Sequence, residues 1–231
     1  MTDVKIDLKK EQQASSEQPR YKYSIAARIL FLAMDIVTGR KSTLSKAKLL
    51  ETLACIPYRE WEIRQYIRMT RRYRNQEFVN WADTILKWGR AAQDNEYMHL
   101  LVMNEKMKED GIKDAWYLFP IIPYFMVLSY IPLSRMLALF SIRRAFLFMA
   151  EFEDHAEHVY AQFVSDNPEW DEQPVKNELV KTYADVDTWG DVFRRVGLDE
   201  RDHRNNCFAA CGKPEYIFKY EGMPSSNDLF Y

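Results

Sequence analysis

The amino-acid sequence predicts an all-α fold, and three observations support that prediction. Glycine and proline are scarce, at 7 and 9 of 231 residues. Residues that favour helices, such as Leu, Met, Arg, Lys and Glu, are abundant, and no segment shows the Val, Ile and Thr alternation of strands. Apolar residues recur at helical spacing along several long segments. A chain of this length forms one large domain or two small ones with a substantial core.

Two Glu-x-x-His pairs, Glu96/His99 and Glu200/His203, indicate metal binding. No other Glu in the chain has a His three residues further on. Residues three apart lie on the same face of a helix, so a carboxylate and an imidazole at this spacing can bind one metal ion.

The two pairs fit the template of a ferritin-like four-helix di-iron bundle. That template takes a single Glu from each of two helices and a Glu-x-x-His from each of the other two. In chain order the four positions are filled by Glu51, Glu96/His99, Glu153 and Glu200/His203. The intervals between them each leave room for a long helix and its connection. Glu51 has Ala47, Ala54, Cys55 and Tyr58 on its face, and a carboxylate in such apolar surroundings needs a partner or a metal.

The other ligand positions also lie on apolar faces. A helix from about Glu77 to Asp110 places Ile85, Trp88, Gly89, Ala92 and Met103 on the face of Glu96 and His99. The last helix places Trp189, Val192, Phe193, Val196, Cys207 and Ala210 on the face of Glu200 and His203. In the third position Glu153 and Glu157 share one stripe, and periodicity does not choose between them. Glu151, Asp154, His155 and His158 mostly point elsewhere.

Two apolar segments predict additional helices that lie in a membrane interface. Ile25–Val37 is too short and too charged to span a bilayer, and Gly39 stops it. Ala115–Leu133 has no charge but contains three prolines, which favours a kinked helix sunk in one leaflet, with Arg135, Arg143 and Arg144 at the headgroups. The alternative is a buried hairpin in a soluble bundle. An arginine-rich segment over residues 64–74 is either a solvated face or a contact for anionic lipids.

Three segments divide the chain. Residues 1–22 are predicted to be a disordered polar tail without the apolar region of a secretory signal, residues 23–211 the helical domain, and residues 212–231 a C-terminal tail. Ser42 or Thr43 is expected to cap a helix that meets Pro57. The formal net charge of -2 gives no support to nucleic-acid binding. The three cysteines form no metal or redox motif, which favours buried thiols in a reducing compartment.

Four motifs in this order resemble those of the alternative oxidase family, over roughly residues 23–211. They are Leu50-Glu51-Thr52, Asn95-Glu96-Tyr97-Met98-His99, Glu153-Asp-His-Ala156 followed by Tyr160, and Asp199-Glu200-Arg-Asp-His203. The third motif, and Cys207 with Cys211 after the fourth, look more like the plastid terminal oxidase type than the mitochondrial one.

The resemblance implies a membrane-bound quinol oxidase that reduces O2 to water at two iron ions. Its iron ligands would be Glu51, Glu96, His99, Glu153, Glu200 and His203. It further implies that Asn95 and Asp199 orient the ligands and that Tyr160 is a redox-active tyrosine beside the irons. Glu157 is a carboxylate that the family does not usually carry. The chain departs from the mitochondrial pattern at Gly197, where that pattern has an arginine, and it has Lys46 where the family tends to carry an arginine. Both departures concern the quinone site.

The partners implied are quinol, O2 and a membrane lipid surface, with a homodimer expected because family members are often dimers. The expected location is one face of an energy-transducing membrane, such as a bacterial inner membrane or a thylakoid. Three alternatives stay open. They are a di-iron hydroxylase of quinone biosynthesis, a ferritin-like iron-storage protein, and a non-enzymatic bundle whose ionisable residues pair internally.

Overall fold

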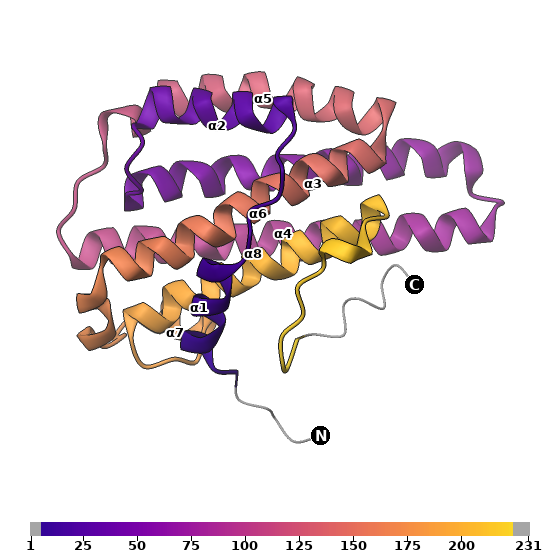
Figure 1. The fold of residues 1–231 in the computed structure, drawn as a ribbon. Helices are drawn as coiled ribbons and strands as arrows, with labels where there is room; N and C mark the ends of the chain where they lie inside the picture. Colours follow the sequence, from indigo (N-terminus) through magenta and orange to yellow (C-terminus); the bar gives the residue numbers. More distant parts are fainter. Residues whose placement is uncertain (1–5, 224–231) are drawn as a thin grey trace. The chain divides into compact units, whose positions relative to one another are not determined.

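The computed structural model describes residues 6–223, and these confirm the all-α class. Figure 1 shows the helices, whose bounds are α1 Leu8–Glu17, α2 Ile25–Thr38, α3 Leu44–Arg72, α4 Gln76–Glu109, α5 Ile121–Phe140, α6 Ile142–Asp166, α7 Glu178–Tyr183 and α8 Trp189–Cys211. Short 3-10 helices are η1 Trp116–Leu118, η2 Pro168–Glu172 and η3 Pro214–Tyr216. The chain divides into two compact units, Thr43–Ala145 and Met1–Ser42 with Phe146–Tyr231.

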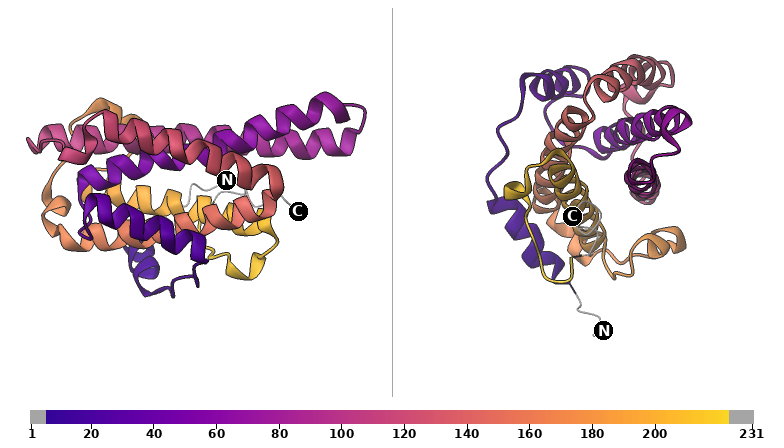
Figure 2. Two further views of the ribbon diagram at one scale, coloured as in Figure 1. Left: turned by 90° about the horizontal axis from the view of Figure 1, so that it is seen from above. Right: turned by 90° about the vertical axis from the view of Figure 1, so that its right-hand side faces the viewer.

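The unit of residues 43–145 is built on the α3–α4 pair, whose helices run side by side in Figures 1 and 2. Thr43 caps α3, as one of the two predicted residues, by accepting a hydrogen bond from the backbone N–H of Lys46. The helix does not end at Pro57 but continues to Arg72. Proline removes one backbone hydrogen bond. Burial of the following Tyr58 and Trp61 offsets that loss.

Helix α4 closely follows its predicted span and approaches α3 at Gly89. Tyr58 and Trp61 form an aromatic cluster with Trp88, with ring centroids 6.1 and 5.1 Å from the Trp88 ring. A Cβ atom at Gly89 would lie 3.3 Å from the carbonyl oxygen of Tyr58, a tight contact with backbone that has little room to move. The absence of a side chain at Gly89 therefore sets how closely the two helices pack.

Helix α5 begins later and ends later than the apolar segment Ala115–Leu133. Its first residues form a turn and η1, and α5 then runs to Phe140 with Pro132 inside it. Arg135, one of the residues expected at lipid headgroups, also contacts the protein. Its Nε lies 2.6 Å from Glu60 Oε2, so this arginine joins α5 to α3.

The outer face of α5 is apolar and open to solvent. Its exposed large side chains are Ile121, Tyr124, Phe125, Leu128, Leu133, Met136, Leu139 and Phe140. Among residues 6–223, α5 is the one helix long and apolar enough to cross a membrane, and 17% of its apolar window is buried. Such a surface is unusual for a helix facing only water.

In the other unit, α2 confirms the predicted apolar helix. It ends at Gly39, whose φ of 82° is a conformation that favours glycine. Ile25, Ile29, Leu32 and Ile36 form an exposed apolar stripe, each more than half exposed.

The prediction of a disordered tail over residues 1–22 is wrong for residues 8–17, which form α1. Asp7 caps this helix, and α1 packs against α8, as Figure 2 shows. Glu11 and Ser15 are buried there although α1 has no apolar stripe. Polar contacts to distant residues, which a local pattern does not reveal, hold this segment in place.

The C-terminal segment after Gly212 packs on α8 as far as residue 223. The backbone N–H of Phe218 donates to Asn205 Oδ1 at 3.0 Å, and the Tyr220 hydroxyl donates to Asp202 at 2.8 Å. The first and last parts of the predicted tails, residues 1–5 and 224–231, lie outside the described residues.

We expect Gly89→Val to lower the free energy of unfolding by about 1–3 kcal/mol, because the new side chain has to push α3 and α4 apart. Denaturant unfolding followed by circular dichroism measures the effect. Ala91→Val is the matched control, since Ala91 is exposed on the same helix. Equal losses in the two variants would contradict the close-approach argument.

Candidate metal centre

In the unit of residues 43–145, α3 and α4 bring Glu51, Glu96 and His99 together. His99 Nδ1 lies 3.3 Å from Glu51 Oε2 and 3.7 Å from Glu96 Oε2. Each of the three side chains offers one ligand atom within 4.8 Å of the others. All are buried, with exposed fractions of 4%, 1% and 0%. We call this group the α3–α4 triad.

The surroundings of the α3–α4 triad are apolar, as the sequence predicted. The predicted stripe on α4 is buried throughout, at Ile85, Trp88, Gly89, Ala92 and Met103. Such surroundings exclude water, and two carboxylates close together in a low-dielectric site repel each other. A bound divalent cation would relieve that repulsion.

Cys55 lies one turn after Glu51 on α3, close enough for the triad carboxylates to act on its thiol. Burial raises the pKa of Cys55 to about 11, and the negative charges of Glu96 and Glu51 add to the effect. The Cys55 thiol therefore stays protonated at neutral pH. The prediction of buried thiols holds for Cys207, whereas Cys55 and Cys211 are half-buried.

In the second unit, α6 and α8 bring Glu153, Glu200 and His203 together. His203 Nδ1 lies 3.5 Å from Glu200 Oε2 and 4.0 Å from Glu153 Oε1. These side chains also offer ligand atoms within 4.8 Å of one another and are buried, at 0%, 1% and 7% exposed. We call this group the α6–α8 triad. It repeats the composition of the first, two carboxylates and one imidazole.

The contacts of Glu157 distinguish it from Glu153, a choice that periodicity left open. Glu157 Oε1 lies 2.8 Å from Arg201 Nε and accepts a hydrogen bond from Ser15 Oγ at 2.7 Å. Its other oxygen lies 3.5 Å from Arg204 Nη1. Glu157 thus has two arginines and a hydroxyl as its partners, and among the described residues it belongs to neither group of side chains that could hold a metal ion.

Tyr160 is buried on α6, two turns after Glu153, at 4% exposed. A Cβ atom at Gly197 of α8 would lie 3.2 Å from the Cβ of Tyr160. Gly197, which departs from the mitochondrial pattern, therefore makes room for the backbone of α8 to pass close to this tyrosine.

Asp199 and Asn95 stand beside the triads in sequence and differ in their surroundings. Asp199 Oδ2 accepts a hydrogen bond from the Tyr183 hydroxyl at 2.6 Å, and Arg195 Nε donates to its other oxygen at 2.9 Å. Asn95 is half-buried on α4. The neighbouring Asp202 has its pKa raised to about 6, chiefly by burial and against the opposing hydrogen bond from Tyr220.

The remaining two histidines do not join either triad, as predicted. The His155 ring stacks on Phe31 of α2, with centroids 4.2 Å apart. His158 Nδ1 and Nε2 lie 2.6 and 2.9 Å from the carbonyl oxygens of Asp154 and Gln18. These rings connect α6 to the N-terminal segment.

Four long helices with these two triads define a helical protein with buried carboxylate and imidazole groups suited to binding metal. A family model of the alternative oxidase matches residues 3–211, so the chain belongs to the alternative oxidase family. That family consists of membrane-associated oxidoreductases with a di-iron centre. A search of curated proteins finds no match. The plastid type stays a prediction.

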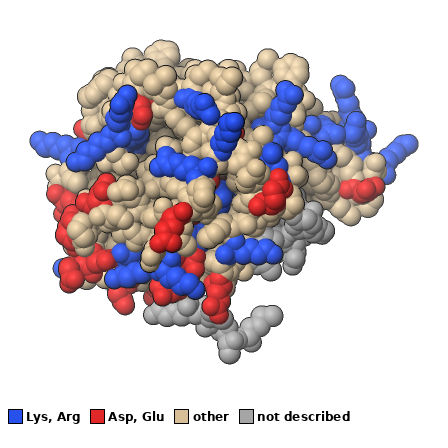
Figure 3. All heavy atoms as spheres, in the orientation of Figure 1, with Lys and Arg blue, Asp and Glu red and all other residues tan. Residues whose placement is uncertain are grey.

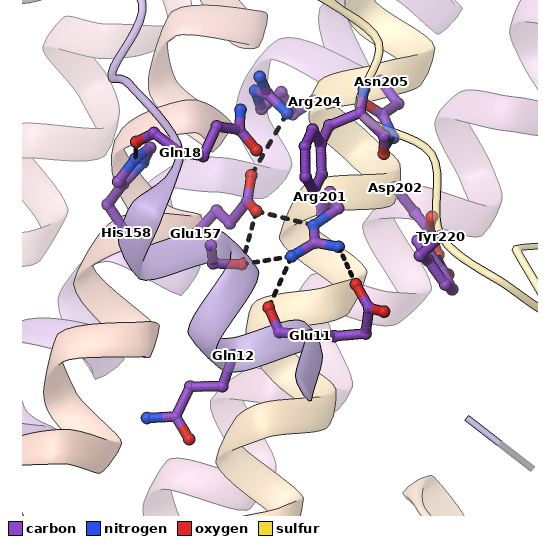
Figure 4. Close-up of polar contacts among 12 residues, drawn as sticks. Glu11, Gln12, Gln18, Glu157, His158, Arg201, Asp202, Arg204, Asn205 and Tyr220 are labelled. Carbon is purple, nitrogen blue, oxygen red and sulfur yellow. Dashed lines mark hydrogen bonds and ion pairs between the residues drawn. The ribbon is translucent and has the colours of Figure 1, made fainter. Parts of the chain in front are cut away.

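Sequence reasoning missed Glu11, Arg201 and Arg204, which surround Glu157. Figure 4 shows their side chains converging from α1 and α8. A signal was present, because Arg201 and Arg204 directly follow the ligand candidates Glu200 and His203. Without a visible acidic partner that signal could not be distinguished from an ordinary solvated face.

We expect the Cys55 and Cys211 thiols to react slowly with an alkylating reagent at pH 8. Burial raises the pKa of each from 9.0 to about 11, so the reactive thiolate fraction falls about 100-fold and recovers only as the pH rises towards 11. Mass spectrometry of peptides taken at intervals measures the rates. The same protein unfolded in guanidinium is the control. Equal rates in the folded and unfolded protein would contradict the prediction.

Proposed function

We propose that this protein is a quinol oxidase that reduces O2 to water at two iron ions, and that the side chains of the α3–α4 triad and of the α6–α8 triad are the iron ligands. The observation that carries the proposal is the pair of matching triads, each buried and each with two carboxylates and one imidazole. They lie on four helices within residues 3–211, the span that the family model matches.

The donor atoms of the two triads fit iron. Carboxylate oxygens are hard ligands, and a set with only two imidazoles leaves the metal able to change oxidation state. With neutral imidazoles the four carboxylates carry four negative charges, which two ferrous ions would balance. Iron in this position supplies one-electron redox chemistry and a place for oxygen to react.

The protein's own residues would supply orientation and a source of electrons and protons. Tyr160 is buried, so its phenol is protected from water and can give up one electron and one proton. The contacts of Asp199 with Arg195 and Tyr183 fix that carboxylate beside Glu200, which restrains α8. Two quinol molecules release the four electrons and four protons that one O2 needs to become two waters.

Membrane attachment is part of the proposal because quinols partition into lipid. The exposed apolar faces of α2 and α5 would lie in the interface, each within its own unit. In Figure 3 Lys and Arg gather where α3 turns into α4. There Arg68 lies over the Phe78 ring at 4.7 Å. Basic residues of this kind suit anionic headgroups. The homodimer stays a prediction.

Oxygen uptake by the iron-loaded protein with a short-chain quinol tests the activity. We expect uptake that yields water and is lost in Glu200→Ala, because this change removes a carboxylate from the α6–α8 triad. Glu178→Ala is the matched control, since Glu178 is exposed on α7 and pairs with Lys181. Iron binding without quinol-driven uptake would overturn the oxidase.

A di-iron hydroxylase of quinone biosynthesis is the alternative, since the same buried carboxylates and imidazoles would serve it. The two reactions differ in the fate of oxygen. An oxidase sends labelled O2 into water only, whereas a hydroxylase places one labelled oxygen atom in the ring of its substrate.

We expect the protein to co-sediment with vesicles containing anionic lipid, and Leu133→Asp with Phe140→Asp to reduce the bound fraction several-fold. Both side chains are exposed on α5, at 66% and 81%, and a charge there opposes burial in lipid. Tyr97→Asp, at an exposed position on α4, is the control. If the variant with both α5 substitutions binds vesicles as well as wild type, the exposed face of α5 is not the membrane-binding surface.

A further inference from the structure

The ligand candidates of the α6–α8 triad are each followed directly by a charged residue. The pairs are Glu153-Asp154, Glu200-Arg201 and His203-Arg204. These neighbours join the two helices. Arg204 Nε donates to Asp154 Oδ1 at 2.9 Å, and Arg201 Nε donates to Glu157 at 2.8 Å.

The links between α6 and α8 are removed from solvent. Asp154, Glu157 and Arg201 are fully buried, and Arg204 is 3% exposed. Buried ion pairs are costly to form and depend strongly on geometry, because each charge has to keep all its partners. They fix the rotation of α8 against α6 at the level of Glu200 and His203.

Helix α1 supplies the remaining hydrogen-bond acceptors of the Arg201 guanidinium, as Figure 4 shows. Arg201 Nη1 donates to Glu11 Oε2 at 2.5 Å, and Nη2 donates to the Glu11 carbonyl oxygen at 2.7 Å and to Ser15 Oγ at 2.6 Å. Ser15 in turn donates to Glu157. The ring of Phe218 covers the guanidinium at 4.9 Å. Arg201 therefore has partners on α1, on α6 and in the C-terminal segment.

A second contact fixes the position of α1 along α6 and α8. Gln12 Oε1 accepts a hydrogen bond from Arg194 Nε at 2.6 Å, and its Nε2 donates to the carbonyl oxygen of Ala161 at 3.0 Å. Because Glu11, Gln12 and Ser15 of α1 all contact α6 or α8, this helix links the two and restrains their relative position.

We propose that α1 is a positioning element of the α6–α8 triad, acting through Glu11 and Ser15 on Arg201 and Glu157. This inference rests on the proposed function. Loss of the Glu11 charge leaves Arg201 with less compensation in a buried site, so Arg201 shifts towards Glu157. Since Arg201 adjoins Glu200 in the chain, the shift turns the ligand carboxylate and loosens the bound metal.

The rate of iron release to a chromophoric ferrous chelator, under anaerobic conditions, tests the proposal in the full-length protein. We expect Glu11→Ala to release iron about tenfold faster than wild type, within the range seen when groups that orient metal ligands are removed. Glu11→Gln keeps the shape and an acceptor oxygen, so an intermediate rate is expected. Ser15→Ala should act in the same direction.

Glu17→Ala is the matched control, because Glu17 is an exposed carboxylate on the same helix whose hydrogen bond is to Gln13. Release is measured well below the melting temperature of every variant, which circular dichroism provides. If Glu11→Ala and Glu11→Gln lower only the melting temperature and release iron at the wild-type rate, α1 is a stabilising segment and the inference is overturned. A Glu17→Ala effect of equal size overturns it too.

Failure of the proposed function gives a different result. In that case wild type and Glu17→Ala alike bind no iron, or bind iron without oxidising quinol. If wild type and the Glu11 variants release iron equally slowly, only the role of α1 is overturned, and the proposed function stands.

Discussion

The structure depends on keeping carboxylates and imidazoles inside a helical core. Each buried ion costs several kcal/mol unless a partner or a metal compensates its charge. The protein meets this cost in two ways on α6. Glu153 stands with His203 and Glu200 in a triad that could hold a metal ion, whereas Glu157, one turn later, is neutralised by arginines. Partner chemistry, not burial, separates a candidate ligand from a structural carboxylate here.

This distinction explains which parts of the site the sequence could predict. The triads follow from short-range spacing, because Glu96/His99 and Glu200/His203 repeat the geometry of a helix face. The environment of Glu157 does not follow from local spacing. Its partner Arg201 also binds Glu11, which lies 190 positions away in the chain. Contacts of that kind leave no periodic signal, and the same lack of an apolar stripe made α1 resemble a disordered tail.

Helix boundaries show the same limit. Gly39 and Thr43 act through local backbone chemistry, and both were predictable. Pro57 also acts locally, yet the packing of Tyr58 and Trp61 on α4 overrides it. The contact of Arg135 with Glu60 joins two helices in a way that the sequence pattern does not reveal. Tertiary contacts change the outcome wherever their free energy exceeds a propensity of a few kcal/mol.

Each unit carries a triad of two carboxylates and one imidazole, but different interactions hold the helices of each triad in place. In the α3–α4 triad, aromatic rings and a glycine hold the helices at a fixed spacing, so rigidity comes from packing. In the α6–α8 triad, ion pairs through Arg201 and Arg204 supply it, with α1 as an added brace. Packing is sensitive to substitutions that change side-chain volume, whereas ion pairs are sensitive to substitutions that change charge. The two triads would therefore differ in which substitutions loosen them, the α3–α4 triad yielding to changes of size and the α6–α8 triad to changes of charge.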